Sequence, residues 1–155
     1  MSSTDPVRRV ITSNKKARYQ FHILDELETG ILLVGTEVKS LRAGQCSIQE
    51  AYVRIKAGEM WLVGANIPEY AFGNRQNHKP TRDRKLLAHR REIQKWFKQV
   101  REKGVTVVPL EVYFRGSLIK LSIGLARGKR LHDKRQVDRE RTDRRDMDRA
   151  LGRRR

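Results

Sequence analysis

The sequence has little cysteine, its acidic residues are outnumbered about two to one by basic residues, and it lacks any long apolar run. Its single cysteine, Cys46, excludes an internal disulfide and leaves no cysteine cluster for a structural zinc. No apolar stretch approaches the roughly 20 residues that a membrane-spanning helix needs, and the segment MSSTDPVRRV lacks the apolar core of a secretory signal. We therefore expect a cytosolic protein.

Catalytic residue sets are also lacking. The histidines are scattered without metal-ligand spacing, and no glycine-rich phosphate-binding fingerprint follows a predicted strand. They are His22, His78, His89 and His132. No sequence feature pairs Cys46 with a base, so we interpret it as a packing residue. The sequence thus predicts no catalytic residues, no metal ligands, no cofactor and no enzymatic activity.

Positive charge, by contrast, is abundant. Lys and Arg number 35 against 18 Asp and Glu, a net charge of +17. Segment 127–155 holds thirteen of the basic and six of the acidic residues, a net +7, so both this segment and the rest are basic. A polyanionic partner is therefore expected along the whole contact, and RNA fits because proteins bind its phosphates and stack its bases on aromatic rings. A solvated face would explain any one basic cluster, but several occur together: Lys15, Lys16 and Arg18; Arg82, Arg84 and Lys85; Lys129 and Arg130.

Segment 127–155 is too polar to bury an apolar core, and we expect it to be disordered when alone. Acidic and basic residues nevertheless alternate at helical spacing, as in Glu140 with Arg144 and Asp146 with Arg149. Each such pair contributes only about 0.2–0.5 kcal/mol, which favours a helix on a partner without holding one alone. The segment lacks the aromatic and leucine face of membrane-surface helices, so no membrane contact is expected. A solvated charge run without a specific role is the alternative.

Three segments divide the chain. Residues 1–13 are polar and interrupted by Pro6, which predicts a flexible leader with order beginning near Asn14. Residues 14–126 fit one compact domain, and 127–155 form the basic tail.

Alternation of apolar and polar residues predicts several short strands in the domain. We expect them over 19–23, 31–34, 52–55, 60–63, 105–114 and 119–125, with turns at 24–30, 57–59 and 115–116. Helices are expected over 36–43, ended by Gly44, and from a cap at Thr81 or Asp83 to Gly104, after a loop at 68–80. These elements predict a mainly β fold, an OB-fold-like antiparallel barrel with flanking helices and a disordered basic C-terminal tail.

Five motifs resemble one protein family closely. They are NKKARYQF (14–21), GTEVKSLRAG (35–44), TRDRKLLAH (81–89), TVVPLEVYF (106–114) and IGLARGKRLHDKR (123–135). In unbroken order they resemble the small protein B family, the SsrA-binding proteins that partner transfer-messenger RNA in bacterial trans-translation. The resemblance runs from Asn14 through the tail, and five separate motifs make it specific.

The resemblance implies an OB-like barrel that binds the transfer-RNA-like domain of transfer-messenger RNA and delivers this RNA to stalled ribosomes. It implies that the tail enters the empty mRNA channel near the decoding centre, among small-subunit rRNA, and becomes helical there. Elongation factor Tu would be an indirect partner through the RNA.

The resemblance also implies functional residues. For transfer-messenger RNA they are Asn14, Lys15, Lys16, Arg18, Glu28, Thr81, Arg82, Lys85 and Leu87. For the ribosome they are Gly128, Lys129, Arg130, His132, Asp133, Lys134 and Arg135. Glu28 is an equally good candidate for an intramolecular ion pair, because a carboxylate repels phosphate. Leu87, next to Leu86, is equally a candidate for the core-facing side of a helix. The sequence departs from the family at Lys79, where an aspartate is common.

Two other functions are compatible with the composition. A constitutive structural protein of the ribosome would also be basic and carry a tail. An RNA-processing enzyme is less well supported, because the sequence offers no catalytic set.

Overall fold

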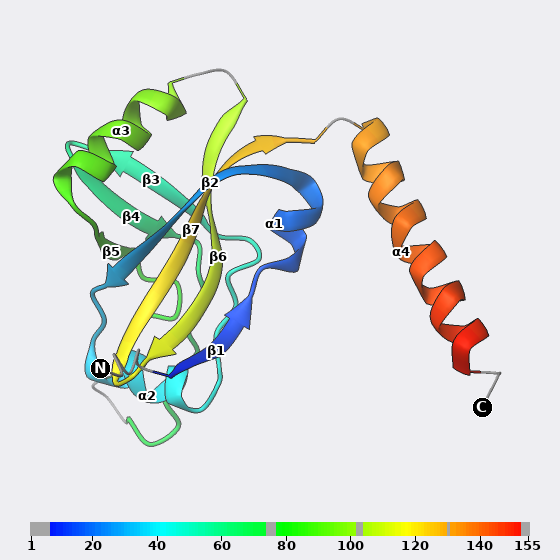
Figure 1. Cartoon of the computed structure of the whole chain (residues 1–155). Coiled ribbons are helices and arrows are strands. Elements are labelled where there is room, and N and C mark those ends of the chain that lie inside the picture. The colour runs from blue at the N-terminus through cyan, green and yellow to red at the C-terminus, as the bar shows by residue number, and fades with distance from the viewer. Residues whose placement is uncertain (1–6, 74–76, 102–103, 130, 153–155) are drawn as a thin grey trace, which may run out of the picture.

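The protein folds around one antiparallel sheet with the strand order β1-β6-β7-β2-β5-β4-β3 (Figure 1). A computed structural model describes residues 7–73, 77–101, 104–129 and 131–152. The strands over these residues are β1 (Arg8–Ser13), β2 (Phe21–Ile31), β3 (Tyr52–Lys56), β4 (Glu59–Val63), β5 (Arg84–Leu87), β6 (Val105–Arg115) and β7 (Leu118–Gly128). The helices are α1 (Lys15–Gln20), α2 (Gly35–Arg42), α3 (Arg90–Val100) and α4 (Leu131–Gly152).

The sheet is strongly curved. Register shifts interrupt the pairing of β2 with β7 and of β6 with β7, and such bulges bend strands. As a result the edge strand β3 approaches β6, although no backbone ladder joins them within the described residues. Partly open barrels of this kind characterise OB-folds. The predicted mainly β, OB-like fold is therefore confirmed.

One hydrophobic core fills the inside of the curved sheet. α3 closes it by burying Ile93 and Trp96 (Figure 1). A smaller cluster under α1 depends on Gly124 of β7, where an added Cβ would lie 2.9 Å from Leu110 Cδ1. Glycine at this position lets Leu110 of β6 and Ile23 of β2 pack closely against β7.

A buried ion pair joins α2 to β5. Glu37 and Arg84 are both 0% exposed, and Arg84 Nε donates to the Glu37 carboxylate at 2.5 Å. The other two guanidinium nitrogens of Arg84 donate to the carbonyls of Ala65 and Pro80, each at 3.0 Å. Arg82 donates to the second carboxylate oxygen of Glu37. Each of the three guanidinium nitrogens of Arg84 thus donates a hydrogen bond, and the carboxylate supplies the counter-charge that burial of a charge requires.

The pKa of Glu37 reflects these contacts. Burial alone raises it, but hydrogen bonds from Arg82, from the Val34 backbone N–H and from Arg84 outweigh burial and hold the pKa below the ordinary value. The carboxylate therefore stays ionised between its two arginines.

Several sequence-based predictions are confirmed. The 52–63 hairpin turns at Ala57 and Gly58, which have φ of 53° and 76°. α2 ends before Gly44, whose φ of 78° is the left-handed geometry of a glycine C-cap. The 115–116 turn and the 68–80 loop are also present, with 74–76 outside the described residues.

Other predictions are wrong near the N-terminus. Residues 8–13 form β1, paired with β6, instead of a flexible leader; residues 1–6 lie outside the described part. Tyr19 lies in α1 and not in a strand, because Asn14 caps this short helix. The expected turn at 24–30 does not exist, since β2 runs through to Ile31, paired with β7 and β5 and interrupted only by a bulge between Ile23 and Asp25.

The start of the second helix was also predicted too early in the sequence. Residues Arg84–Leu87 form β5, paired with β4 and β2, and α3 starts only at Arg90. The ion pair of Arg84 with Glu37 and the ladder to β4 outweigh the helical spacing, so Thr81 and Asp83 cap no helix.

The tail differs from its prediction as well. β7 continues to Gly128, two residues past the expected boundary, because Gly128 pairs with Phe21. Leu131–Gly152 form α4, the helix that was expected on the ribosome, while disorder of the tail alone stays a prediction. The helix places residues such as Glu140 and Arg144 one turn apart, the spacing at which opposite charges stabilise a helix.

We expect Glu37→Ala to lower the free energy of unfolding by about 3–5 kcal/mol, because it leaves Arg84 buried without its counter-charge. Urea unfolding measures this change. Glu26→Ala is the control, since it removes an exposed pair with Arg18 and should cost less than about 1 kcal/mol. Similar losses in both variants would contradict a structural role for the buried pair.

Candidate nucleic-acid interface

Basic side chains of α1 lie on the surface at one end of β2. Lys15 is exposed, Lys16 pairs with Glu50 at 2.5 Å, and Arg18 pairs with Glu26 at 3.2 Å. Both pairs are solvent-accessible, and such pairs are weak enough to exchange a carboxylate for a phosphate. The three cations are therefore accessible to a polyanion.

Asn14, in contrast, is part of the framework. It is 2% exposed, and its side-chain oxygen accepts from the Ala17 backbone N–H at 3.0 Å, which caps α1. Its amide nitrogen donates to the carbonyls of Pro109 and Ile48 at 2.8 and 3.3 Å. Burial and three internal hydrogen bonds thus occupy the Asn14 side chain, and its direct contact with RNA stays a prediction.

The start of the tail lies against α1. Lys129 donates from its backbone to Gln20 O at 2.8 Å and from Nζ to Arg18 O at 3.1 Å. Farther along, the Arg141 guanidinium lies 5.4 Å from the centroid of the Tyr19 ring. We call Lys15, Lys16, Arg18 and Lys129 the α1 surface.

The other predicted tail residues follow directly. Gly128 ends β7, and Arg130 lies outside the described residues. His132, Asp133 and Lys134 belong to the first turn of α4, and Arg135 on the same helix is exposed. The predicted ribosomal motif thus spans the junction between the sheet and α4.

A second surface lies at the far end of β2. The steps from Phe21 to Gly30 span about 30 Å at a rise of ~3.3 Å per residue. Gly30 pairs with Leu87 of β5 on one side and with Lys120 of β7 on the other. We call Glu28, Lys85, Leu87 and Lys120 the β2–β5 surface.

Leu87 is an apolar residue whose side chain is exposed to solvent on this surface. It is 47% exposed, whereas Leu86 is 1% exposed, because neighbouring strand residues point to opposite faces. The alternative that Leu87 faces the core on a helix is therefore wrong. Leu87 lies over Gly30, where an added Cβ would come within 3.2 Å of Leu87 Cβ. Glycine at 30 lets the leucine lie flat across the strand.

Glu28 has intramolecular partners, as its alternative interpretation expected. It accepts from Arg115 Nη1 at 2.8 Å and from the Tyr113 hydroxyl. The Tyr113 hydrogen bond is the main cause that lowers the pKa of Glu28; burial opposes it, while Arg115 and Lys120 add to it. The same contact with Glu28, after burial, raises the pKa of Tyr113. Because Arg115 and Lys120 surround the carboxylate, the β2–β5 surface is positive in spite of Glu28.

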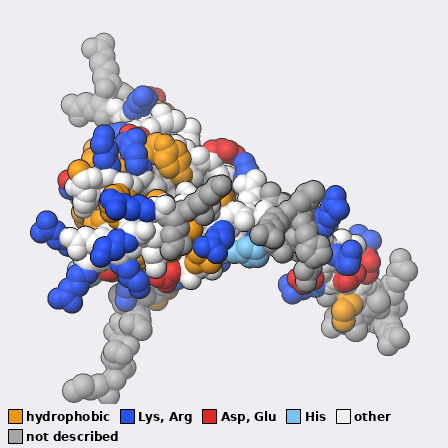
Figure 2. All heavy atoms as spheres, turned by 90° about the horizontal axis from the view of Figure 1, so that it is seen from above, with side chains coloured by type: hydrophobic (Ala, Val, Ile, Leu, Met, Phe, Trp, Pro, Cys, Tyr) orange, Lys and Arg blue, Asp and Glu red, His pale blue; other side chains and the backbone are white. Residues whose placement is uncertain are grey.

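The remaining predicted residues lead into β5. Thr81 is exposed, and Arg82 joins Glu37 to the carbonyl of Leu32, 3.3 Å away. Lys85 pairs with Glu59 at 3.2 Å and is about one-third exposed. The predicted RNA-binding residues therefore form two separated surfaces instead of one patch. Figure 2 shows Lys and Arg side chains spread widely over the face seen from above.

The sequence analysis missed Arg115 and Lys120. Their only sequence signal is position: they flank the tight turn between two alternating strands, which brings them beside Glu28 only once the register is known. Pairing register, and not local composition, assembles this surface.

No metal-ligand cluster and no candidate membrane-spanning helix occur among the residues that the structure describes. Burial raises the pKa of the Cys46 thiol to about 11, with the charge of Arg84 acting in the opposite direction. The thiol is thus protonated at neutral pH and a poor nucleophile. His78 is 7% exposed and hydrogen-bonds to Thr36 and to the Ile67 carbonyl, so it serves the fold.

An open, curved antiparallel sheet with basic surfaces is the architecture of a nucleic-acid-binding domain. Comparison with known proteins gives the family. The SmpB protein family model matches residues 11–153, and the chain belongs to this family.

Relatives match over nearly the whole chain. An SsrA-binding protein of Kineococcus radiotolerans is 53% identical over 147 residues, 95% of this chain and 94% of its own. An SsrA-binding protein of Gloeothece citriformis is 50% identical over 154 residues, 99% of both chains. A chain of the solved structure "tmRNA-SmpB: a journey to the center of the bacterial ribosome" is similar with a TM-score of 0.65 and 42% identity, covering 83% of this chain and 94% of that chain.

We expect Asn14→Ala to destabilise the fold by about 1–3 kcal/mol, because it removes a helix cap and leaves buried backbone groups unpaired. Lys15→Ala is the control and should change stability by less than about 0.5 kcal/mol. RNA binding, measured well below the melting temperature, should weaken in Lys15→Ala and stay near wild type in Asn14→Ala. A larger loss of RNA affinity in Asn14→Ala would restore Asn14 as a contact residue.

Proposed function

We propose that this protein is an RNA-binding adaptor of trans-translation. It binds the transfer-RNA-like domain of transfer-messenger RNA and delivers this RNA to stalled ribosomes in the cytoplasm. The observation that carries the proposal is membership of the SmpB protein family, with SsrA-binding relatives about half identical over nearly the whole chain. The protein performs no chemistry of its own, and elongation factor Tu joins it only through the RNA.

The globular part holds the RNA. On the β2–β5 surface, Lys85 and Lys120 neutralise phosphates together with the adjacent Arg115, while exposed Leu87 offers an apolar contact to an unstacked base or a ribose. On the α1 surface, Lys15, Lys16 and Arg18 add phosphate contacts. At the other end of β2, the hydroxyl of Thr81, which precedes β5, adds one more. A folded RNA is large enough to touch both ends of β2 at once.

The tail binds the ribosome. α4 has 22 residues and so a length of about 33 Å. Exposed arginines, including Arg135, Arg139 and Arg144, lie along α4 on more than one face. A helix with cations around its circumference suits a channel lined by rRNA phosphates, and the motif at Gly128–Arg135 lies where the helix joins the sheet. The tail thus occupies the mRNA channel only when mRNA is absent, near the decoding centre.

A chain ending at Arg130 tests this division of labour. It keeps the pairing of Gly128 with Phe21 and the contacts of Lys129, so the sheet should stay intact. We expect its affinity for the transfer-RNA-like domain to stay within about threefold of the full chain, since most phosphate contacts remain. Tagging of nascent chains on stalled ribosomes should be lost in a reconstituted reaction.

The matched control is Leu87→Asp, which should weaken RNA binding with α4 intact. Loss of most RNA affinity in the shortened chain would contradict the proposed role of the globular part. Normal tagging by the shortened chain would contradict the role of the tail.

A further inference from the structure

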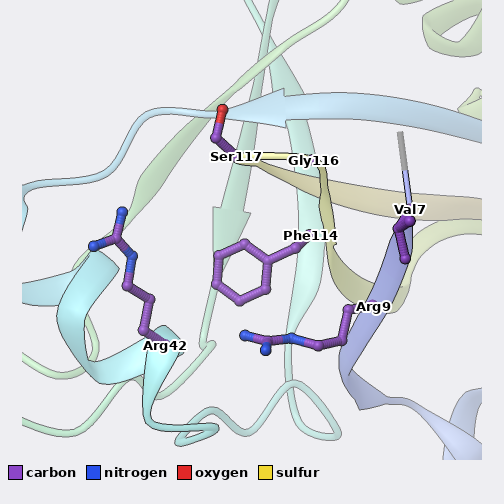
Figure 3. Close-up of a pocket in the computed structure, with 6 residues that line it drawn as sticks. All are labelled: Val7, Arg9, Arg42, Phe114, Gly116 and Ser117. Atoms are coloured by element: carbon purple, nitrogen blue, oxygen red, sulfur yellow. The ribbon is translucent and has the colours of Figure 1, made fainter. Parts of the chain in front are cut away.

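A pocket of about 450 Å³ opens between β1, the β6–β7 turn and α2 (Figure 3). Its lining residues are Val7, Arg9, Arg42, Phe114, Gly116 and Ser117. None of them belongs to the predicted RNA-binding or ribosome-binding residues. Most of the pocket wall is apolar, and its polar side chains are two arginines and one serine.

The two arginines reach the pocket from separate elements. Arg9 pairs with Phe114 in the β1–β6 ladder, and its guanidinium lies 4.9 Å from the centroid of the Phe114 ring. Arg42 comes from the last turn of α2, on the other side of the ring (Figure 3). The phenyl ring is only 7% exposed, so it forms a fixed wall beside the two cations.

Neither of these two guanidiniums forms an ion pair with any residue that the structure describes. Neighbouring cations differ, since Arg8 pairs with Glu111 and Arg115 pairs with Glu28. The C-terminal end of α2 favours a cation at Arg42 by about 0.3–1 kcal/mol, but this effect gives no reason for Arg9 to face the same pocket. Two unpaired guanidiniums beside an apolar wall form a site for an anion.

We propose that this pocket binds a phosphodiester group of RNA. Arg9 and Arg42 donate to the phosphate oxygens from two sides, the hydroxyl of Ser117 supplies a further donor, and the attached ribose lies against Val7 and the edge of Phe114. The site rests on the proposed function for its partner, and it extends the RNA contact past Arg115 to the other side of the β6–β7 turn.

The family model alone would miss two of the six lining residues, Val7 and Arg9. The family model begins at residue 11, so Arg9 lies outside the matched residues. The residue also lies in the segment that sequence patterns predict to be a flexible leader. Only the pairing of β1 with β6 brings Arg9 to Phe114.

Binding of the transfer-RNA-like domain by Arg9→Gln, Arg42→Gln and the double variant tests the proposal. Each single variant should bind about tenfold or more weakly, the usual effect of losing a hydrogen bond to a charged group. Because both arginines hold one phosphate, the double variant should lose less than the product of the single losses, and its salt slope should fall by about 0.7–0.9.

Arg101→Gln is the matched control. Arg101 also lies over a phenyl ring, 4.7 Å from the centroid of Phe97, but lines no part of this pocket. The control removes the same charge and should leave affinity within about twofold, and melting temperatures verify that every variant is folded. Losses in Arg9→Gln and Arg42→Gln no larger than in Arg101→Gln would overturn the proposal.

A second arm does not depend on transfer-messenger RNA. Titration with a uridine trinucleotide should shift the Nε–Hε NMR signals of Arg9 and Arg42 together, and not that of Arg101. If the wild-type protein fails to bind the transfer-RNA-like domain, the proposed function fails while this titration still decides the pocket. Absence of shifts at Arg9 and Arg42 would refute the phosphate site.

Discussion

The buried carboxylate of Glu37 is the constraint on which much of the surface depends. It holds Arg84 in the core and Arg82 at the edge, so α2, β5 and the end of the 68–80 loop share one fixed point. The elements that it fixes present Lys85 and Leu87 on β5 and Arg42 on α2. Burying two charges is costly unless their hydrogen bonds are complete, so these elements have little freedom to shift. The positions of these surface cations therefore depend on the buried Glu37 carboxylate.

The long central strands β6, β7 and β2 set the distance between the two basic surfaces. The α1 surface and the β2–β5 surface lie at opposite ends of β2, about 30 Å apart. The tail leaves from the α1 end. A rigid domain of this kind can contact a folded RNA at two points while α4 extends away from the sheet (Figure 1). The geometry of one sheet thus separates the RNA-binding surfaces of the domain from the tail.

How much the sequence predicts depends on whether a feature is local. The 52–63 hairpin and α2 with its glycine cap are local patterns and were predicted correctly, and the five motifs, which are also local, identified the family. β1 and β5 were missed because long-range pairing with β6 and with β4 and β2 decides them. Local patterns also do not predict that Asn14, which is polar, is buried or that Leu87, which is apolar, is exposed. The family motif contains both residues but does not distinguish a framework role from a contact.

Directed hydroxyl-radical probing tests most directly whether the globular part and the tail contact different RNAs. In a Cys46→Ser background, an iron chelate is attached to Leu32→Cys, next to β5, or to Met147→Cys on α4, both exposed positions. On stalled ribosomes carrying transfer-messenger RNA, the probe at 32 should cleave the transfer-RNA-like domain, and the probe at 147 should cleave small-subunit rRNA along the empty mRNA channel. Cleavage of the same RNA segment from both positions would contradict the account.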